Sequence, residues 1–132
     1  GLASHPELVN LLNRVRTPFN INRSAQAAAV VALGDQQHVN DSIALVSAQS
    51  DMMSAQLTAL GFRVAPSCAN FLFFDCGQPA AELAQRLLCD GVIIKPWREK
   101  GYEHWIRVSV GNEQDNQQFI RSLKRILAED AA

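Results

Sequence analysis

Arg107 is the side chain in this sequence that is best suited to bind an anion. In the run Trp105–Val110 apolar residues alternate with the others, so Arg107 shares one face of an expected strand with Trp105 and Ser109. A guanidinium is costly to bury unless an anion meets it, and its planar shape matches a carboxylate or a phosphate. If this face lines a cleft, Arg107 is an anion receptor. Otherwise it lies in water on an edge strand or pairs with a nearby Glu.

Lys95 offers a second positive charge that follows another expected strand, Val92–Ile94. A cation at the end of one strand and Arg107 on the next would converge on one doubly charged anion if the two strands adjoin. The alternative is a solvated loop in which Glu99 and Glu103 supply the counter-charges. The sequence leaves both interpretations open.

Three asparagines are candidates for polar contacts with a ligand. Asn20 and Asn22 lie in the irregular segment Thr17–Asn22, where Pro18 disfavours helix at the residue before it. Asparagine suits turns for local reasons, which is the main alternative to a binding role. Asn70 opens an expected strand and either orients a ligand or closes a turn.

No complete catalytic set is visible in the chain. The histidines do not have metal-ligand spacing to one another or to a cysteine, and we expect no metal site. The chain also has no glycine-rich phosphate-binding motif. The residue patterns alone therefore name no catalytic chemistry.

The composition is that of a globular protein, with 132 residues, 48% hydrophobic and 19% charged. A net charge of -1 argues against a broad basic surface for nucleic acid or an anionic membrane. The longest apolar runs, such as Ala25–Leu33, are shorter than the roughly 20 residues that span a bilayer. The chain has three cysteines, Cys68, Cys76 and Cys89, and no two of them are closely spaced. This pattern predicts reduced thiols in a cytoplasmic protein, and we expect most of these side chains to fill the core.

The periodicity of the apolar residues predicts an α/β fold in which helices cover a small antiparallel or mixed sheet. Helices are expected at residues 6–15, 25–33, 38–60, 80–88 and from Asn112 onward, and strands at 62–64, 70–75, 92–94 and 105–110. In the long helix 38–60 apolar residues recur at steps of three, four and seven, which predicts one amphipathic face. The expected domain boundary is near Gly34–Asp35, where an alanine-rich helix gives way to the long one.

An ordered set of short phrases resembles the C-terminal portion of the histidinol-phosphate aminotransferases, which are fold-type I pyridoxal-phosphate enzymes of the class I/II group. The phrases extend over essentially the whole chain: Pro6–Val9, Val15–Asn22, Ala25–Ala28, Leu60–Phe62, Pro66–Ser67, Ala69–Leu72, Gly91–Pro96 and Ile106–Gly111. Threonine-phosphate decarboxylases and other amino-acid aminotransferases are similar too. The resemblance is therefore more specific for the group than for the substrate.

The resemblance implies that residues 1–34 end a large cofactor domain and that residues 35–132 form a C-terminal small domain. The lysine that holds pyridoxal 5'-phosphate would lie upstream of Gly1, so this piece would bind no cofactor and be inactive alone. The implied enzyme is a cytoplasmic homodimer of histidine biosynthesis. It converts histidinol phosphate and 2-oxoglutarate to imidazole-acetol phosphate and glutamate.

The resemblance also assigns roles to three residues. Arg107 stands at the arginine that holds the phosphate of histidinol phosphate or the α-carboxylate of glutamate. Lys95 stands where this group usually has a second arginine, which replaces a two-pronged donor with a point charge. Asn20 falls on a segment near the dimer interface and the mouth of the active site. A different class of function, a non-catalytic α/β module that binds a small anion or a protein partner, stays open.

Overall fold

The computed structural model describes residues 5–130, and residues 1–4 and 131–132 at the ends of the two predicted domains lie outside the described part. The chain divides into two compact units, Gly1–Val39 and Asn40–Ala132. The division lies five residues after Gly34, the last residue of the predicted first domain. That these units are parts of two domains of a larger enzyme stays a prediction.

The first unit contains two helices, α1 (Pro6–Val15) and α2 (Arg23–Gly34), close to their predicted positions. Proline stands at the start of α1, where its missing N–H is not needed. The side chain of Asn22 caps α2, because its Oδ1 accepts a hydrogen bond of 2.8 Å from the backbone N–H of Ala25. Every described side chain from residue 5 to residue 39 is exposed.

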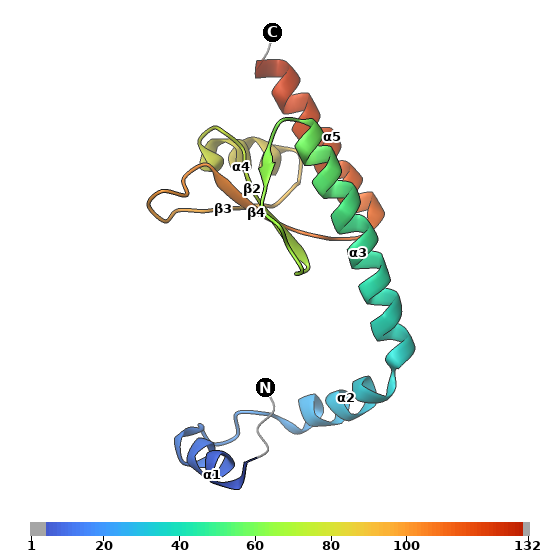
Figure 1. Cartoon of the computed structure of the whole chain (residues 1–132), viewed down its shortest axis with the longest axis vertical. Coiled ribbons are helices and arrows are strands. Elements are labelled where there is room, and N and C mark those ends of the chain that lie inside the picture. The colour runs from blue at the N-terminus through green and yellow to red at the C-terminus, as the bar shows by residue number, and fades with distance from the viewer. Residues whose placement is uncertain (1–4, 131–132) are drawn as a thin grey trace. The chain divides into compact units, whose positions relative to one another are not determined.

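Helix α3 (Gln36–Ala59) begins two residues before the predicted position, and its apolar face is only partly buried. Met53 and Leu57 are fully buried, whereas Ile43 is 63% exposed. Within the second unit α3 runs beside α5 (Glu113–Asp130), as Figure 1 shows, and Lys124 of α5 donates to Gln56 of α3 at 3.1 Å. The predicted amphipathic face is therefore covered by this unit over its C-terminal half.

The second unit is built on a four-stranded antiparallel sheet with strand order β1-β2-β4-β3. The strands are β1 (Arg63–Val64), β2 (Phe71–Asp75), β3 (Lys95–Pro96) and β4 (Trp105–Ser109). The predicted strand at residues 92–94 is wrong, because pairing with β4 begins only at Lys95. Its apolar residues Val92 and Ile94 are partly buried and pack against the core.

One face of the sheet is buried under α3, α4 (Ala80–Cys89) and α5, which confirms the predicted α/β class. The core-facing residues of the two central strands alternate with half-buried ones along each strand. The buried apolar set comes from all three helices, both central strands and the residue after β2: Met53, Leu57, Leu72, Phe74, Cys76, Ala80, Leu83, Leu87, Ile106, Val108, Phe119, Ile120, Leu123 and Ile126. The other face carries the candidate site.

The three cysteines are free thiols, and only Cys76 fills the core as predicted. Burial raises the pKa of the Cys76 thiol, so this side chain stays protonated and apolar. Cys68 and Cys89 are exposed, so the prediction that most of the cysteines are core residues is wrong. Among residues 5–130 no helix combines the length and the apolar character needed to cross a membrane.

Candidate functional site

Arg107 lies at the centre of β4, an interior strand, with a neighbour on each side. Its cross-strand partners are Phe73 on β2 and Lys95 on β3. Directly opposed residues of an antiparallel pair project from the same face, so the two cations lie side by side. They line one hollow of about 300 Å³, together with Ile93, Ile94 and Ser109. The structure thus brings Arg107 and Lys95 together, and the edge-strand alternative for Arg107 is wrong.

The Arg107 guanidinium is half-buried and rests on an aromatic ring. Its central carbon lies 4.1 Å from the centroid of the Phe71 ring. Within residues 5–130 it forms no ion pair with a carboxylate. The alternative in which Arg107 pairs with a nearby Glu is therefore also wrong, and its N–H donors remain available to a ligand.

Arg63 on β1 shows what a partnered arginine looks like on the same sheet. Its guanidinium lies over Trp105 at 4.9 Å and donates a 3.0 Å hydrogen bond to Asp75. The hydrogen bond from the backbone N–H of Gly77 lowers the pKa of Asp75 below its ordinary value, and the hydrogen bond from Arg63 lowers it by a smaller amount. The Asp75 carboxylate is therefore charged at neutral pH. Asp75 balances the charge of Arg63, whereas no carboxylate among residues 5–130 forms an ion pair with Arg107.

Lys95 is exposed, and its ammonium lies 4.8 Å from the centroid of the Trp97 ring. The acidic residues that the sequence offered as its counter-charges are used elsewhere. Glu99 accepts from the backbone N–H of Arg98 at 3.2 Å, and Glu103 accepts from that of Gly101 at 3.0 Å. Hydrogen bonds from the backbone N–H groups of Glu103 itself and of Gly101 lower the pKa of Glu103. Lys95 therefore keeps its charge free beside Arg107.

An aromatic cluster fixes the loop after β3 to the same face of the sheet. Phe73 stacks on Trp105 at 4.6 Å and meets Trp97 edge to face at 5.3 Å, and Tyr102 completes the cluster. The sequence analysis missed Phe71 and Phe73, because only the pairing of β2 with β4 places them beside Arg107. The run Phe71–Phe74 is apolar throughout, so the sequence does not show which of its residues share a face with Arg107.

Asn20 lies in the first unit, between α1 and α2, and not in the unit that holds the two cations. Its Oδ1 accepts a long hydrogen bond of 3.4 Å from Arg16. It lines a separate hollow of about 410 Å³ with Arg16, Phe19 and other residues of that segment. Asn22 is a helix cap, as the turn interpretation of the sequence expected.

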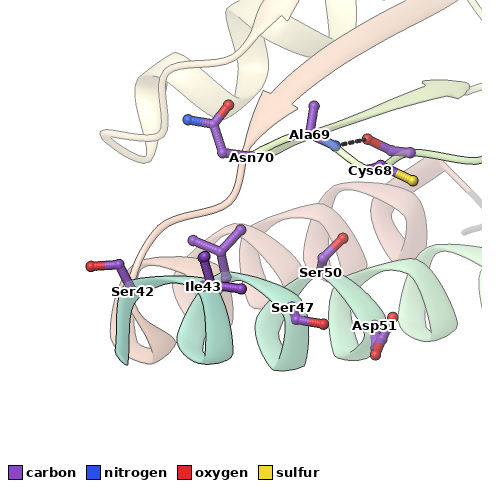
Figure 2. Close-up of a pocket in the computed structure, with 10 residues that line it drawn as sticks. Ser42, Ile43, Ser47, Ser50, Asp51, Cys68, Ala69 and Asn70 are labelled. Carbon is purple, nitrogen blue, oxygen red and sulfur yellow. Dashed lines mark hydrogen bonds between the residues drawn. The ribbon is translucent and has the colours of Figure 1, made fainter. Parts of the chain in front are cut away.

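Asn70 lines a different groove, of about 510 Å³, between α3 and the segment Ser67–Asn70 (Figure 2). Serines, one carboxylate and one exposed thiol of this groove are drawn in the figure, including Ser47, Asp51 and Cys68. Neither lysine nor arginine lines it among the described residues. The two cations of the candidate site therefore do not line this groove.

The chain matches the aminotransferase class I and II family over residues 1–123. It belongs to this family. Histidinol-phosphate aminotransferase 1 of Mesorhizobium japonicum is 46% identical over 127 residues, which cover 96% of this chain and 35% of that protein. Histidinol-phosphate aminotransferase 3 of Rhizobium meliloti is 43% identical over 128 residues, covering 97% of this chain and 35% of that protein. The chain spans about a third of the length of these curated relatives and corresponds to their C-terminal third.

The fold agrees with a solved member of the class I and II aminotransferases. The crystal structure of histidinol-phosphate aminotransferase from Sinorhizobium meliloti in complex with pyridoxal 5'-phosphate superposes with a TM-score of 0.83 at 23% identity. The match covers 94% of this chain and 35% of that one. At this identity the likeness concerns the fold alone.

The described residues of this aminotransferase segment do not fit a site for the cofactor itself. Such a site needs a sheltered lysine whose amine forms an imine. The three lysines of the sequence are all exposed. Lys95 lies over Trp97, Lys124 bonds to Gln56, and Lys100 lies on the loop after β3. Among residues 5–130 no lysine is therefore sheltered in the way that a cofactor lysine requires.

Proposed function

We propose that this chain is the substrate-anion-binding part of a pyridoxal-phosphate-dependent histidinol-phosphate aminotransferase. The reaction would convert histidinol phosphate and 2-oxoglutarate to imidazole-acetol phosphate and glutamate. The observation that carries the proposal is the pair Arg107 and Lys95, side by side on one face of the sheet without acidic partners in residues 5–130. The names of the similar proteins supply the substrate class.

Both substrates of this reaction carry anionic groups that suit the site. The in-plane N–H groups of Arg107 bind a carboxylate or one edge of a phosphate through two parallel hydrogen bonds. Lys95 adds a point charge at the rim, which favours a doubly charged phosphate. Because β4 is bonded on both sides, Arg107 holds the substrate at a fixed place relative to the sheet.

The bond-making chemistry belongs to residues outside this chain. Pyridoxal 5'-phosphate would be held by the preceding part of the enzyme, which includes the lysine that this segment lacks. We also propose that residues 1–34 complete that part, residues 35–132 form the small domain, and the intact enzyme is a homodimer with Asn20 near its active-site mouth. The exposed first unit supports this, since Phe19 is 98% and Val31 is 74% exposed and available for burial.

The test is Arg107→Ala in the full-length enzyme, with steady-state kinetics for both substrates. Loss of the charged hydrogen bonds should cost about 2–4 kcal/mol of binding, seen as a rise in KM for each substrate. Arg63→Ala is the matched control, because Arg63 lies on the same sheet but is balanced by Asp75. An unchanged KM for both substrates in Arg107→Ala would reject the proposed role.

A further inference from the structure

We propose that Phe71 is a positioning residue for Arg107, acting as a support beneath the guanidinium without touching the substrate. The inference rests on the proposed function, because it concerns the same anion site. It starts from the distance of 4.1 Å between the guanidinium carbon and the ring centroid. This is the shortest of the three cation-over-ring contacts that the described residues make.

The strand register produces this contact. Phe71 is paired with Ser109 and Phe73 with Arg107, so Phe71 and Arg107 are diagonal neighbours on one face. Diagonal residues are far enough apart for a long side chain to lie across an aromatic ring. The ring of Phe73 is engaged with Trp105 and Trp97, which leaves Phe71 as the ring beneath the guanidinium.

The backbone at Phe71 is held by hydrogen bonds at two neighbouring carbonyl groups. The Ser67 hydroxyl donates a 2.7 Å hydrogen bond to the carbonyl oxygen of Phe71. The backbone N–H of Val110 donates a 2.9 Å hydrogen bond to the carbonyl oxygen of Asn70, the residue that precedes Phe71. The ring is half-buried at the start of β2. Arg107 therefore rests on a ring whose backbone is anchored at the start of β2.

Phe71 and Asp75 each orient a guanidinium, Phe71 that of Arg107 and Asp75 that of Arg63, but they differ in what they leave available to a ligand. Asp75 orients Arg63 by using one of its N–H donors and by cancelling its charge. A ring beneath the guanidinium attracts the cation through its face and leaves the in-plane N–H groups free. Phe71 thus orients Arg107 while preserving the charge and the two-pronged edge that bind an anion. Without the ring the long side chain would have to be ordered at the moment of binding.

The experiment compares Phe71→Leu, Phe71→Tyr and Phe62→Leu in the full-length enzyme. Phe71→Leu should raise KM for both substrates by about 2- to 30-fold, which corresponds to the energy range of a cation–π contact, with kcat within about twofold. Phe71→Tyr keeps the ring and should keep the wild-type KM. Phe62→Leu removes a half-buried ring that packs on Phe74 at 5.5 Å, and should leave KM unchanged.

The results for Arg107 and Phe71 separate the proposed function from the proposed role of Phe71. If Arg107→Ala raises KM and Phe71→Leu does not, the role of Phe71 is rejected and the proposed function stands. If Arg107→Ala has no effect, the proposed function fails and the inference with it. Equal rises for Phe71→Leu and Phe71→Tyr would show that the ring is not what matters. If Phe71→Leu unfolds, Phe71→Met replaces it as the ring-free variant, with a thermal melt as the check of folding.

Discussion

At the scale of single residues, the local surroundings separate two arginines that the sequence presents as the same kind of side chain. Arg63 and Arg107 both lie over aromatic rings on one face of the sheet. Only Arg63 has an acidic partner in the part of the chain that the structure describes, and that partner is Asp75. An uncompensated, half-buried guanidinium is unfavourable unless a ligand completes it. The absence of an acidic partner among residues 5–130 is what supports the proposal that Arg107 binds the substrate anion.

Lys95→Ala should weaken substrate binding less than Arg107→Ala does. Lys95 is exposed, so water and salt screen its charge, and it offers a point charge without a two-pronged edge. We expect a rise in KM of about 2- to 5-fold for the phosphate substrate, decreasing as salt is added. Steady-state kinetics of the full-length enzyme at two ionic strengths measure this. Lys100→Ala, in the exposed loop, is the control. An equal rise in KM for Lys95→Ala and Lys100→Ala would contradict the role of Lys95 in binding the phosphate.

At the scale of elements, two ion-pair clusters join α4 to the end of α5 beneath the sheet. Arg86 of α4 donates to Asp130 at 2.6 Å and to Glu129 at 3.1 Å. Arg125 of α5 donates to Asp90, which follows α4, at 2.7 Å, and also pairs with Glu129. These contacts close the helical layer at its edge, where apolar burial ends. They join α4 to α5, two of the helices that cover the sheet.

Asp90→Asn should remove stability at neutral pH but not in acid. The hydrogen bond from Arg125 is the main cause that lowers the pKa of Asp90 in the folded chain, and a hydrogen bond from Ser122 adds to it. A lowered folded-state pKa gives stability that is fully present above the unfolded value, near 4, and is lost as pH falls through the folded value. We expect wild type to be more stable than Asp90→Asn at pH 7, with the difference shrinking at an acidic pH below the unfolded value, near 4.

Urea unfolding at both pH values measures this free-energy difference. Glu82→Gln is the matched control, since Glu82 lies on α4 and forms no ion pair among residues 5–130. A difference between wild type and Asp90→Asn that does not depend on pH would contradict the assignment of the stability to the charged carboxylate.

At the scale of the whole molecule, the two units differ in how much apolar surface they bury. The core residues all come from the second unit, whereas the described side chains of the first are exposed. Helices of 10 and 12 residues, such as α1 and α2, are marginal in water unless their apolar residues are packed. The second unit has the means to fold alone, and the first needs a partner surface.

We expect the 132-residue chain by itself to form oligomers in size-exclusion chromatography. The exposed apolar residues of α2 supply the cause, since Val30, Val31 and Leu33 are 72%, 74% and 77% exposed. Val31→Ser should shift the elution toward the monomer. Ile93→Ser is the control, because Ile93 is 83% exposed but lies in the second unit. A clean monomer of the unmodified chain would contradict this prediction.

The order and type of the elements follow from the sequence by itself. Apolar spacing, proline and glycine are local signals, and they place the helices and most strands within a few residues of where they lie. The choice of Arg107 also comes from a local signal, its place in the alternation of β4. Lys95 was a candidate from the sequence, although the strand expected just before it does not form.

What only the tertiary structure decides is which side chains meet. The order β1-β2-β4-β3 makes β4 interior and sets Lys95 and Phe73 on its two sides. It also lays Phe71 under Arg107 and removes Glu99 and Glu103 as counter-charges. The pairing of β2 with β4 joins residues thirty or more positions apart in the chain, and its register depends on burial of the whole core. No local pattern in a single sequence contains that information.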